Sequence, residues 1–140
     1  MPVINPYLNF DGTAREAMEF YREVFGGEPL QFMTFGDTGP EGKFTEEEKK
    51  RIMHVSLKIG GNMLMASDIA PSFGQVLNKG NYNYISVSAD SREDADKYFS
   101  KLSEGGTIEI PMEDMFWGDY FGSFIDKYGI PWMISYANPQ

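Results

Sequence analysis

The stretch Thr13–Gly27, TAREAMEFYREVFGG, and the stretch Ser91–Gly105, SREDADKYFSKLSEG, decide the fold. Each opens on a hydroxyl residue of the kind that caps a helix, and each closes on glycine, which commonly ends one. Apolar residues recur at intervals of three and four in both, so each stretch predicts an amphipathic helix. Thr13 and Glu16 also have the spacing of a capping box, which we expect at the start of the first helix.

The two stretches match residue by residue at a constant offset of 78 positions. The matched pairs are Thr13 with Ser91, Ala17 with Ala95, Phe20 with Tyr98, Tyr21 with Phe99, Val24 with Leu102, and Gly27 with Gly105. Because cap, apolar face and stop coincide at one offset, the pattern indicates that the chain repeats one structural unit.

Segments in which polar and apolar residues alternate, typical of β-strands, surround both helices. They cover residues 3–10, 30–35, 52–59 and 63–67 in the first half, and residues 83–89, 107–111, 120–125 and 131–136 in the second half. Residues 36–50 predict a solvated loop that can hold one helical turn, and residues 112–119 predict a loop rich in aromatic side chains.

This order predicts an α+β chain built from two βαβββ modules. We expect module 1 at about residues 1–70, a linker at about 68–80 and module 2 at about 81–140, together forming a single domain. One helix on four strands is too small to bury its sheet alone, so the two sheets are expected to pair into a partly open β-barrel. The concave side of the paired sheets would then form a pocket between the modules.

The composition limits the chemistry. With 140 residues, of which 41% are hydrophobic and 24% charged, the chain can bury a core. It has no cysteine, which excludes disulfides, thiolate metal sites and cysteine nucleophiles. It has one histidine, His54, which excludes zinc sites built on two or three histidines of one subunit.

The charge limits the partners. A net charge of −9 and a pI of about 4.5 disfavour nucleic acid and anionic membrane surfaces. No apolar run is long enough to span a bilayer, and residues 1–10 lack the features of a signal peptide. We therefore expect a cytoplasmic protein.

The sequence resembles the vicinal oxygen chelate superfamily, which includes glyoxalases, extradiol dioxygenases, fosfomycin-resistance enzymes and bleomycin-binding proteins. It is most similar to the PhnB-like branch, which often carries a 3-demethylubiquinone methyltransferase label. The residues that carry the resemblance are Pro6–Phe10, Ala14–Ala17, Phe20–Tyr21, Val24–Glu28, Met53–Leu57, Leu64–Asp68, Phe116–Asp119, Phe121–Gly122, Asp126, Gly129 and Trp132–Met133. The resemblance implies the glyoxalase/bleomycin-resistance fold and a homodimer. Methyl transfer has no support, since there is no strand–GxGxxG–helix unit.

The metalloenzymes of that superfamily hold a divalent metal with His and Glu from four strands. The resemblance places these four positions at about Pro6, near Met65, at Tyr84 and at Met133. A phenol and a thioether are poor ligands for Mg, Mn, Zn or Fe(II). The resemblance therefore predicts no metal cofactor, and a divalent metal would need a non-standard site.

Two positions stand out as candidates for function. His54 alternates with Met53 and Val55, so it would face the concave pocket and serve as a general base or bind an anion; otherwise it is a solvated histidine without chemistry. Trp117–Asp119 precedes a strand and could stack on and hydrogen-bond a ligand, or fold back onto the core.

The remaining candidates are acidic, phenolic or sulfur-containing. The carboxylates Glu109, Glu113, Asp114 and Asp119 form a local acidic cluster that could share a proton, bind a cation or form a solvated face. Tyr84 and Tyr136 are hydroxyl donors or core residues, and Met63, Met65 and Met133 form an adaptable lining or fill the core. The predicted ligand-binding set is His54, Tyr84, Trp117, Asp119, Phe121 and Met133.

Three functions remain open. The leading hypothesis is a metal-free protein that binds an unknown small molecule in the pocket between the modules. The alternative is a lyase, transferase or isomerase of small oxygenated substrates, with or without a metal, that uses His54 as its catalytic residue with a carboxylate such as Glu109 or Asp119. The third is a structural or regulatory protein without a ligand.

Overall fold

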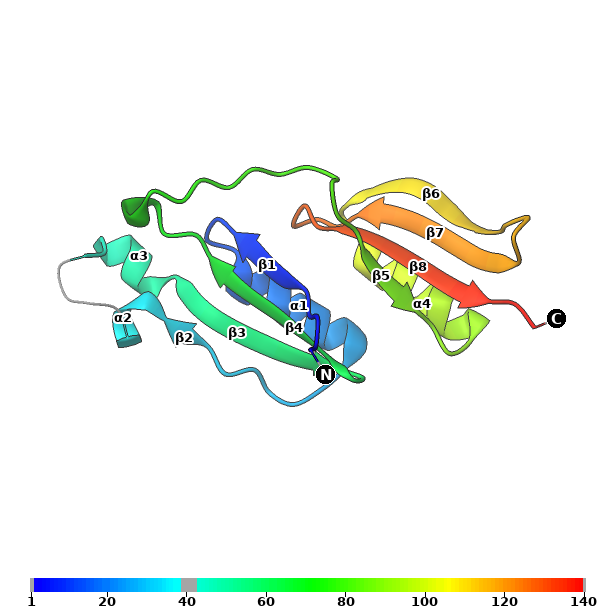
Figure 1. Cartoon of the computed structure of the whole chain (residues 1–140), viewed down its shortest axis with the longest axis horizontal. Helices are drawn as coiled ribbons and strands as arrows, with labels where there is room; N and C mark the ends of the chain where they lie inside the picture. Colours follow the sequence, from blue (N-terminus) through cyan, green and yellow to red (C-terminus); the bar gives the residue numbers. More distant parts are fainter. Residues whose placement is uncertain (1, 39–42, 140) are drawn as a thin grey trace. The chain divides into compact units, whose positions relative to one another are not determined.

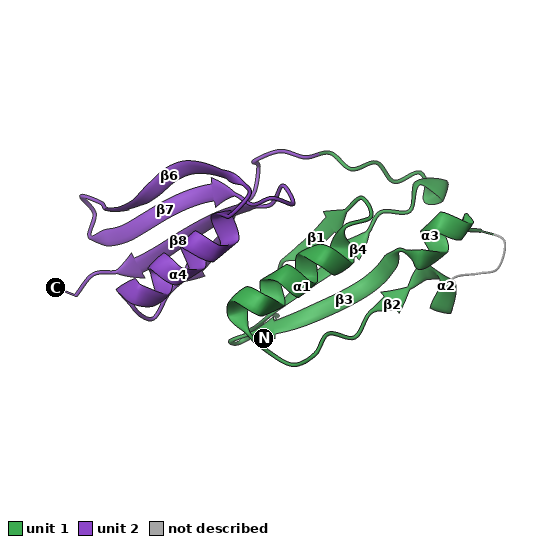
Figure 2. Ribbon diagram, turned by 180° about the vertical axis from the view of Figure 1, so that it is seen from behind, with its two compact units in different colours: residues 1–78 green, residues 79–140 purple. Residues whose placement is uncertain are grey.

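The computed structural model describes residues 2–38 and 43–139. The chain divides into two compact units, Met1–Asn78 and Lys79–Gln140 (Figure 2). Each unit consists of one long helix and a four-stranded mixed sheet (Figure 1). The prediction of an α+β chain with two βαβββ repeats is confirmed.

In the first unit the strand order is β1-β4-β3-β2, with β1 parallel to β4 and the other neighbours antiparallel. Its elements are β1 (Tyr7–Phe10), α1 (Ala14–Phe25), β2 (Met33–Thr34), α2 (Phe35–Thr38), α3 (Glu46–Lys50), β3 (Ile52–Ile59), β4 (Asn62–Asp68) and the short 3-10 helix η1 (Pro71–Phe73).

The second unit repeats this topology, with the strand order β5-β8-β7-β6 and β5 parallel to β8. Its elements are β5 (Ile85–Ser88), α4 (Arg92–Ser103), β6 (Thr107–Asp114), β7 (Asp119–Ile125) and β8 (Pro131–Ala137). The two long helices begin and end at the same offset of 78 residues that the sequence predicts. None of the described helices has the length and apolarity needed to cross a membrane.

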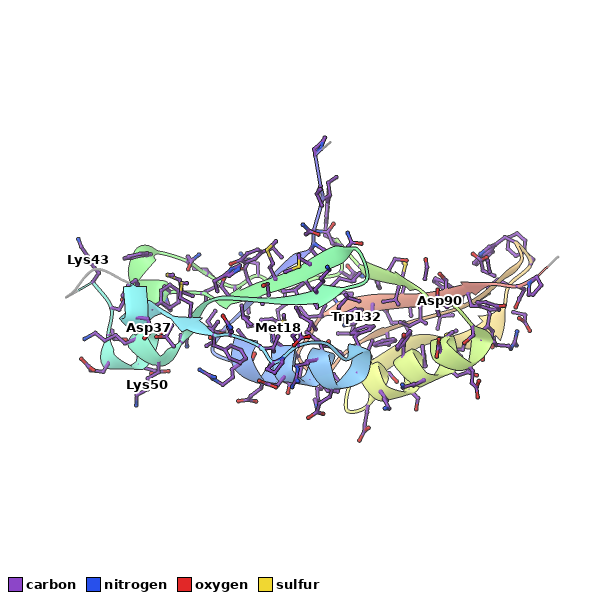
Figure 3. All side chains as sticks on the ribbon, turned by 90° about the horizontal axis from the view of Figure 1, so that it is seen from below. Met18, Asp37, Lys43, Lys50, Asp90 and Trp132 are labelled. Atoms are coloured by element: carbon purple, nitrogen blue, oxygen red, sulfur yellow. The ribbon has the colours of Figure 1, made fainter. Side chains whose placement is uncertain are left out.

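Each long helix packs its apolar stripe on its own sheet. In the first unit, Ala14, Ala17, Met18 and Tyr21 of α1 are completely buried, and Figure 3 shows Met18 in the layer between this helix and the sheet. In the second unit, Phe99 and the strand residue Phe124 meet edge to face, with ring centroids 5.1 Å apart. Burying each large side chain of these cores contributes roughly 1.5–3 kcal/mol.

The start of α1 corrects the capping-box prediction. The Thr13 side chain makes no capping hydrogen bond, and its backbone lies at φ −111° and ψ 12°, outside the extended conformation of a typical cap. Instead, Asp68 Oδ1 at the end of β4 accepts from the N–H groups of Gly12 and Ala14, both at 2.9 Å. Its Oδ2 accepts from Ile52 N at 2.9 Å, so one buried carboxylate joins the helix to two strands. In α4, by contrast, Ser91 caps the helix by accepting from Asp94 N, as predicted.

The segment predicted as a solvated loop, residues 36–50, contains α2 and α3 in its described part. A capping box does form here: Thr45 accepts from Glu48 N at 3.1 Å, and Glu48 accepts from Thr45 N at 2.9 Å. Glu48 is buried and also accepts from the N–H and hydroxyl groups of Ser72, which hold the pKa of its carboxyl at about 2. In the same segment, Phe35 and Phe44 pack together as a small aromatic cluster.

Several strand boundaries also differ from the prediction, and the strand expected at residues 3–10 is reduced to Tyr7–Phe10. The strand expected at residues 30–35 is reduced to Met33–Thr34, which pairs irregularly with β3. By contrast, β6 is longer than predicted, because it continues through Pro111 to Asp114 into the segment predicted as a loop. Proline is tolerated there because β6 is an edge strand with two irregularities in its pairing.

Candidate functional site

In each sheet one face lies under the helix and the other is turned away from that helix. Along β4, for example, Leu64 and Ala66 are buried while Met63 and Met65 are partly exposed. We call the uncovered faces the first and second open faces. The first comprises Tyr7, Met33, His54, Ser56, Met63 and Met65, and the second comprises Glu109, Glu113, Asp119, Phe121, Ser123 and Met133.

Strand register defines the second open face. Phe124 contacts Phe99 of α4 and lies opposite Trp132, so these strand residues point toward the helix. Because neighbouring residues on a strand point to opposite faces, Ser123 and Met133, which also pair, point away from it. The helix-facing Trp132 donates from Nε1 to the buried Asp126 at 2.8 Å, which fixes the β7–β8 turn.

A hydrogen-bonded group crosses the second open face. The Tyr84 hydroxyl, just before β5, donates to Glu109 Oε1 on β6 at 2.8 Å, and Ser123 Oγ donates to the same oxygen at 3.4 Å. This bond raises the pKa of the Tyr84 phenol above its ordinary value, because it stabilises the protonated phenol as a donor to the carboxylate. Since β5 and β6 are the two edge strands of this sheet, the contact crosses the width of the second open face.

An aromatic group stands at one end of the same face. Trp117 lies in the turn between β6 and β7, is 54% exposed, and donates from Nε1 to Asp119 Oδ2 at 3.2 Å. Its ring lies 6.0 Å from that of Phe121 and is tilted by 64°. The turn is closed by a bond from Met115 N to Asp119 O at 2.8 Å. Of the two alternatives for this segment, the exposure of Trp117 favours a ring open to solvent, and its role in ligand binding stays a prediction.

The predicted acidic cluster is divided between the two faces. Asp114 pairs with Tyr120 and faces the helix, where Arg92 binds it through two N···O contacts of 2.7 and 2.9 Å. Arg92, followed by Asn138, lowers the pKa of the Asp114 carboxyl to about 2. Glu113 pairs with Phe121 and, like Asp119, belongs to the second open face. Strand alternation thus separates carboxylates that are adjacent in the sequence.

His54 lies on the first open face, in the other unit. Its Nδ1 is 3.3 Å from the Tyr7 hydroxyl, and the two ring centroids are 5.9 Å apart. Met33 is its direct cross-strand neighbour on β2. The predicted location of His54 opposite the helix-facing Val55 is confirmed. A catalytic role for it stays a prediction, since its hydrogen-bond partner is the Tyr7 phenol rather than a carboxylate.

The register also changes one inferred correspondence. Tyr84 precedes the helix-facing Ile85, which pairs with Trp132, and the equivalent residue before the helix-facing Leu8 is Tyr7. Tyr7, and not Pro6, is therefore the counterpart of Tyr84. The number of residues between the matching positions of the first strand and the start of the helix differs by one between the two modules. The offset of 78 residues that relates the two helices therefore does not relate the strands that precede them.

The structure thus brings most of the predicted ligand-binding residues to one sheet. Tyr84, Trp117, Asp119, Phe121 and Met133 belong to the second unit, and His54 to the first. Within the described residues, no group of three or more His, Cys, Asp or Glu side chains could hold a metal ion. Sequence reasoning missed the shared bonds of Tyr84 and Ser123 to Glu109, because they depend on which segments the sheet brings to one face, 25 and 14 residues apart in the chain.

Comparisons with known proteins agree on the fold. A model of the Glyoxalase/Bleomycin resistance protein/Dioxygenase superfamily matches residues 3–134. Protein YjdN of Escherichia coli (strain K12) is 30% identical over 147 residues, covering 98% of this chain and 97% of YjdN. The crystal structure of PA1353 from Pseudomonas aeruginosa matches with a TM-score of 0.87 and 34% identity, over 99% of this chain and 100% of that one. The PhnB protein of Bacillus cereus matches with a TM-score of 0.75 and 24% identity, over 97% and 100%, which shows likeness of fold.

Proposed function

This chain belongs to the Glyoxalase/Bleomycin resistance protein/Dioxygenase superfamily, and from that premise we propose that it binds a small molecule on its open sheet faces without a resident metal ion. The second open face supports this best. It combines hydroxyl groups and carboxylates with partly exposed aromatic rings, the mixture that orients and covers small ligands. That the ligand lies between the two modules stays a prediction.

The observation that carries the proposal is the group around Glu109. Two hydroxyl groups, those of Tyr84 and Ser123, converge on one carboxylate oxygen and fix it on the second open face. Beside them, Met133 offers a flexible thioether surface, and Trp117 offers an exposed indole at the rim. Such an arrangement can hydrogen-bond a polar group of a ligand while aromatic and thioether surfaces cover its apolar part.

The residues do not fit the metal that the superfamily's metalloenzymes use. The positions that the resemblance assigns to metal ligands are about Pro6 and near Met65 in the first unit, and Tyr84 and Met133 in the second. Phenol and thioether groups do not replace the imidazole and carboxylate oxygen that hard or borderline divalent ions need. We therefore route no step of the proposed function through a metal.

One observation favours the second candidate, an enzyme that uses His54. The Tyr7 hydroxyl lies 3.3 Å from His54 Nδ1, and a phenol–imidazole pair can relay a proton to a substrate. The carboxylate of the earlier hypothesis, Glu109 or Asp119, belongs to the other unit. A lyase, transferase or isomerase would therefore have Tyr7 rather than a carboxylate as the partner of His54 within its own unit.

Metal analysis and a binding titration test the proposal together. The chain has two tryptophans, and Trp117 is exposed while Trp132 is 1% exposed, so a ligand at the second open face should alter mainly the Trp117 fluorescence. A panel of small aromatic alcohols, acids and amines is titrated into protein treated with a chelator. We expect saturable changes in the wild type, and isothermal titration calorimetry with the same compounds should show weaker binding to Trp117→Ala, which lacks the fluorescent reporter.

Two results would contradict this proposal. One is a stoichiometric metal in the purified protein that His54→Ala removes, which would favour the enzyme. The other is saturable binding that Trp117→Ala leaves unchanged in both affinity and thermal shift, which would place the ligand elsewhere.

We also propose that the protein is a homodimer, as the family resemblance implies. Sedimentation equilibrium at micromolar concentration should then give twice the chain mass of 15.9 kDa. A mass equal to that of one chain would contradict the dimer but would leave the proposed ligand binding intact.

A further inference from the structure

We infer that the second open face selects ligands that carry a positive charge next to an aromatic or other apolar group. This inference rests on the proposed function, because it names the class of ligand that the same face would take. It follows from the distribution of charge in the second sheet, from the partners of its carboxylates, and from a comparison of the two faces of that sheet.

The strands of the second sheet carry negative charge only. Their sequences, ISVS, TIEIPMED, DYFGSFI and PWMISYA, contain no lysine or arginine. They do contain carboxylates, and Glu109, Glu113 and Asp119 belong to the second open face. A face that carries charges of one sign attracts small molecules of the opposite sign.

The carboxylates of this face have neutral partners or none. Glu109 accepts from hydroxyl groups through Oε1, and Asp119 accepts from the Trp117 indole. Among the described residues, Glu109 Oε2 and both oxygens of Glu113 have no hydrogen-bond or ion-pair partner. The negative charge of this face is therefore not compensated by the unit itself.

The helix-facing side of the same sheet shows what a carboxylate paired with an aromatic residue across two strands can bind. There, Asp114 lies opposite the aromatic Tyr120, and Arg92 both bonds to this carboxylate and lies over the ring, 3.7 Å from its centroid. One residue away in the same register, Glu113 lies opposite the aromatic Phe121 on the open face. The two carboxylate–aromatic pairs are alike, but the protein supplies a cation to only one of them.

A ligand cation beside Phe121 would combine charge attraction to Glu113 with attraction to the face of the ring. The neighbouring Trp117 indole, 6.0 Å from the Phe121 ring, adds a second aromatic surface for the apolar part of the ligand. A protonated amine or guanidinium attached to an apolar group meets these requirements. An anionic ligand would be repelled by the carboxylates of this face.

Three probes of nearly equal shape test the charge preference: 2-phenylethylammonium, 2-phenylethanol and phenylacetate. Each is titrated against Trp117 fluorescence at constant ionic strength. We expect the cation to bind at least about tenfold more tightly than the alcohol, and the anion to bind most weakly. Glu113→Gln and Glu109→Gln together should abolish most of this preference, because both amides keep the shape but lose the charge.

Glu93→Gln is the matched control. Glu93 is exposed in the first turn of α4 and its substitution changes the net charge of the chain by the same amount per residue, so it should leave the preference intact. Equal or tighter binding of the alcohol or the anion would overturn the inference while the proposed function stands. A preference that survives the double variant would also overturn it. If none of the three probes gives a saturable response, both the inference and the proposed binding at this face fail.

Discussion

Replacing Asp68 by alanine removes the carboxylate that holds the first unit together at the start of α1. Asp68 is 2% exposed and accepts three backbone hydrogen bonds of 2.9 Å, from Gly12, Ala14 and Ile52. Among the residues that the structure describes, no other side chain caps this helix, since Thr13 makes no capping bond. The substitution therefore leaves the first turn of α1 and the first residue of β3 without their acceptor.

The expected loss follows from the burial of these donors. The bonds of Ala14 and Ile52 are buried, whereas the bond of Gly12 is partly buried, and water can replace the acceptor only at Gly12. Each buried donor left without a partner costs about 1–3 kcal/mol. We therefore expect Asp68→Ala to lower the free energy of unfolding by about 3–5 kcal/mol, a large share of the stability of a small domain.

Asp68→Asn separates the parts of this effect. Its amide oxygen can still accept from the N–H groups of α1, but its NH₂ group then faces the N–H of Ile52. The expected loss is about 1–3 kcal/mol, smaller than for alanine. Asp11→Ala is the control, because Asp11 is an exposed carboxylate whose ion pair with Arg51, at 2.8 Å, contributes less than about 1 kcal/mol.

Urea denaturation followed by circular dichroism measures all three variants. The order of destabilisation should be Asp11→Ala, then Asp68→Asn, then Asp68→Ala, with the slope of the transition unchanged. The reasoning is refuted if Asp68→Ala unfolds within about 1 kcal/mol of the wild type.

Three further predictions concern stability and can be tested by the same denaturation assay. Trp132→Phe should lower the free energy of unfolding by about 2 kcal/mol, because it removes the indole bond to the buried carboxylate of the β7–β8 turn. Trp117→Phe, at an exposed position, should change it by less than about 0.5 kcal/mol. Equal effects of the two substitutions would contradict this prediction. Gly106→Ala should cost more than about 3 kcal/mol or prevent folding, because its Cβ would lie 2.1 Å from a backbone oxygen of β7, while Gly61→Ala, whose Cβ has open space, should be tolerated. Glu48 has a pKa lowered from 4.5 to about 2, so its contribution is fully present above pH 4.5 and is lost as the pH falls toward 2; Glu48→Gln should reduce the loss of stability over that interval, and parallel pH profiles would contradict the assignment.

The architecture could be predicted because it is encoded locally and twice. Helix spacing, a hydroxyl at the start and glycine at the end recur at one offset, and the structure confirms both helices at that offset. The cap of α1 could not be predicted in the same way. Thr13-x-x-Glu16 and Thr45-x-x-Glu48 have the same spacing, yet only the second forms a capping box. At the first, a carboxylate 54 residues away from Ala14 takes the donors instead, which no local pattern reveals.

The candidate site could be predicted in part for a related reason. Strand alternation correctly places Val55 toward the helix and His54 away from it. It also separates Glu113 from Asp114, but only once β6 is known to continue past Pro111. The sequence suggests a break at this proline because its missing N–H weakens a ladder, whereas an edge strand tolerates it. The length of one strand thus decides which carboxylates belong to the site.

The two modules share a topology but not the chemistry of their open faces, and this difference bears on how function arises in a duplicated fold. The helix-facing side of each sheet must pack against a helix, and both units solve this with large buried apolar residues. The open faces have no such common constraint: the first carries His54 and methionines, and the second carries carboxylates, hydroxyls and aromatic rings. Resemblance in topology therefore identifies the superfamily, whereas the ligand must be inferred from the open faces. The uncompensated carboxylates of the second face are the side chains there that discriminate most strongly between ligands, because they attract cations and repel anions.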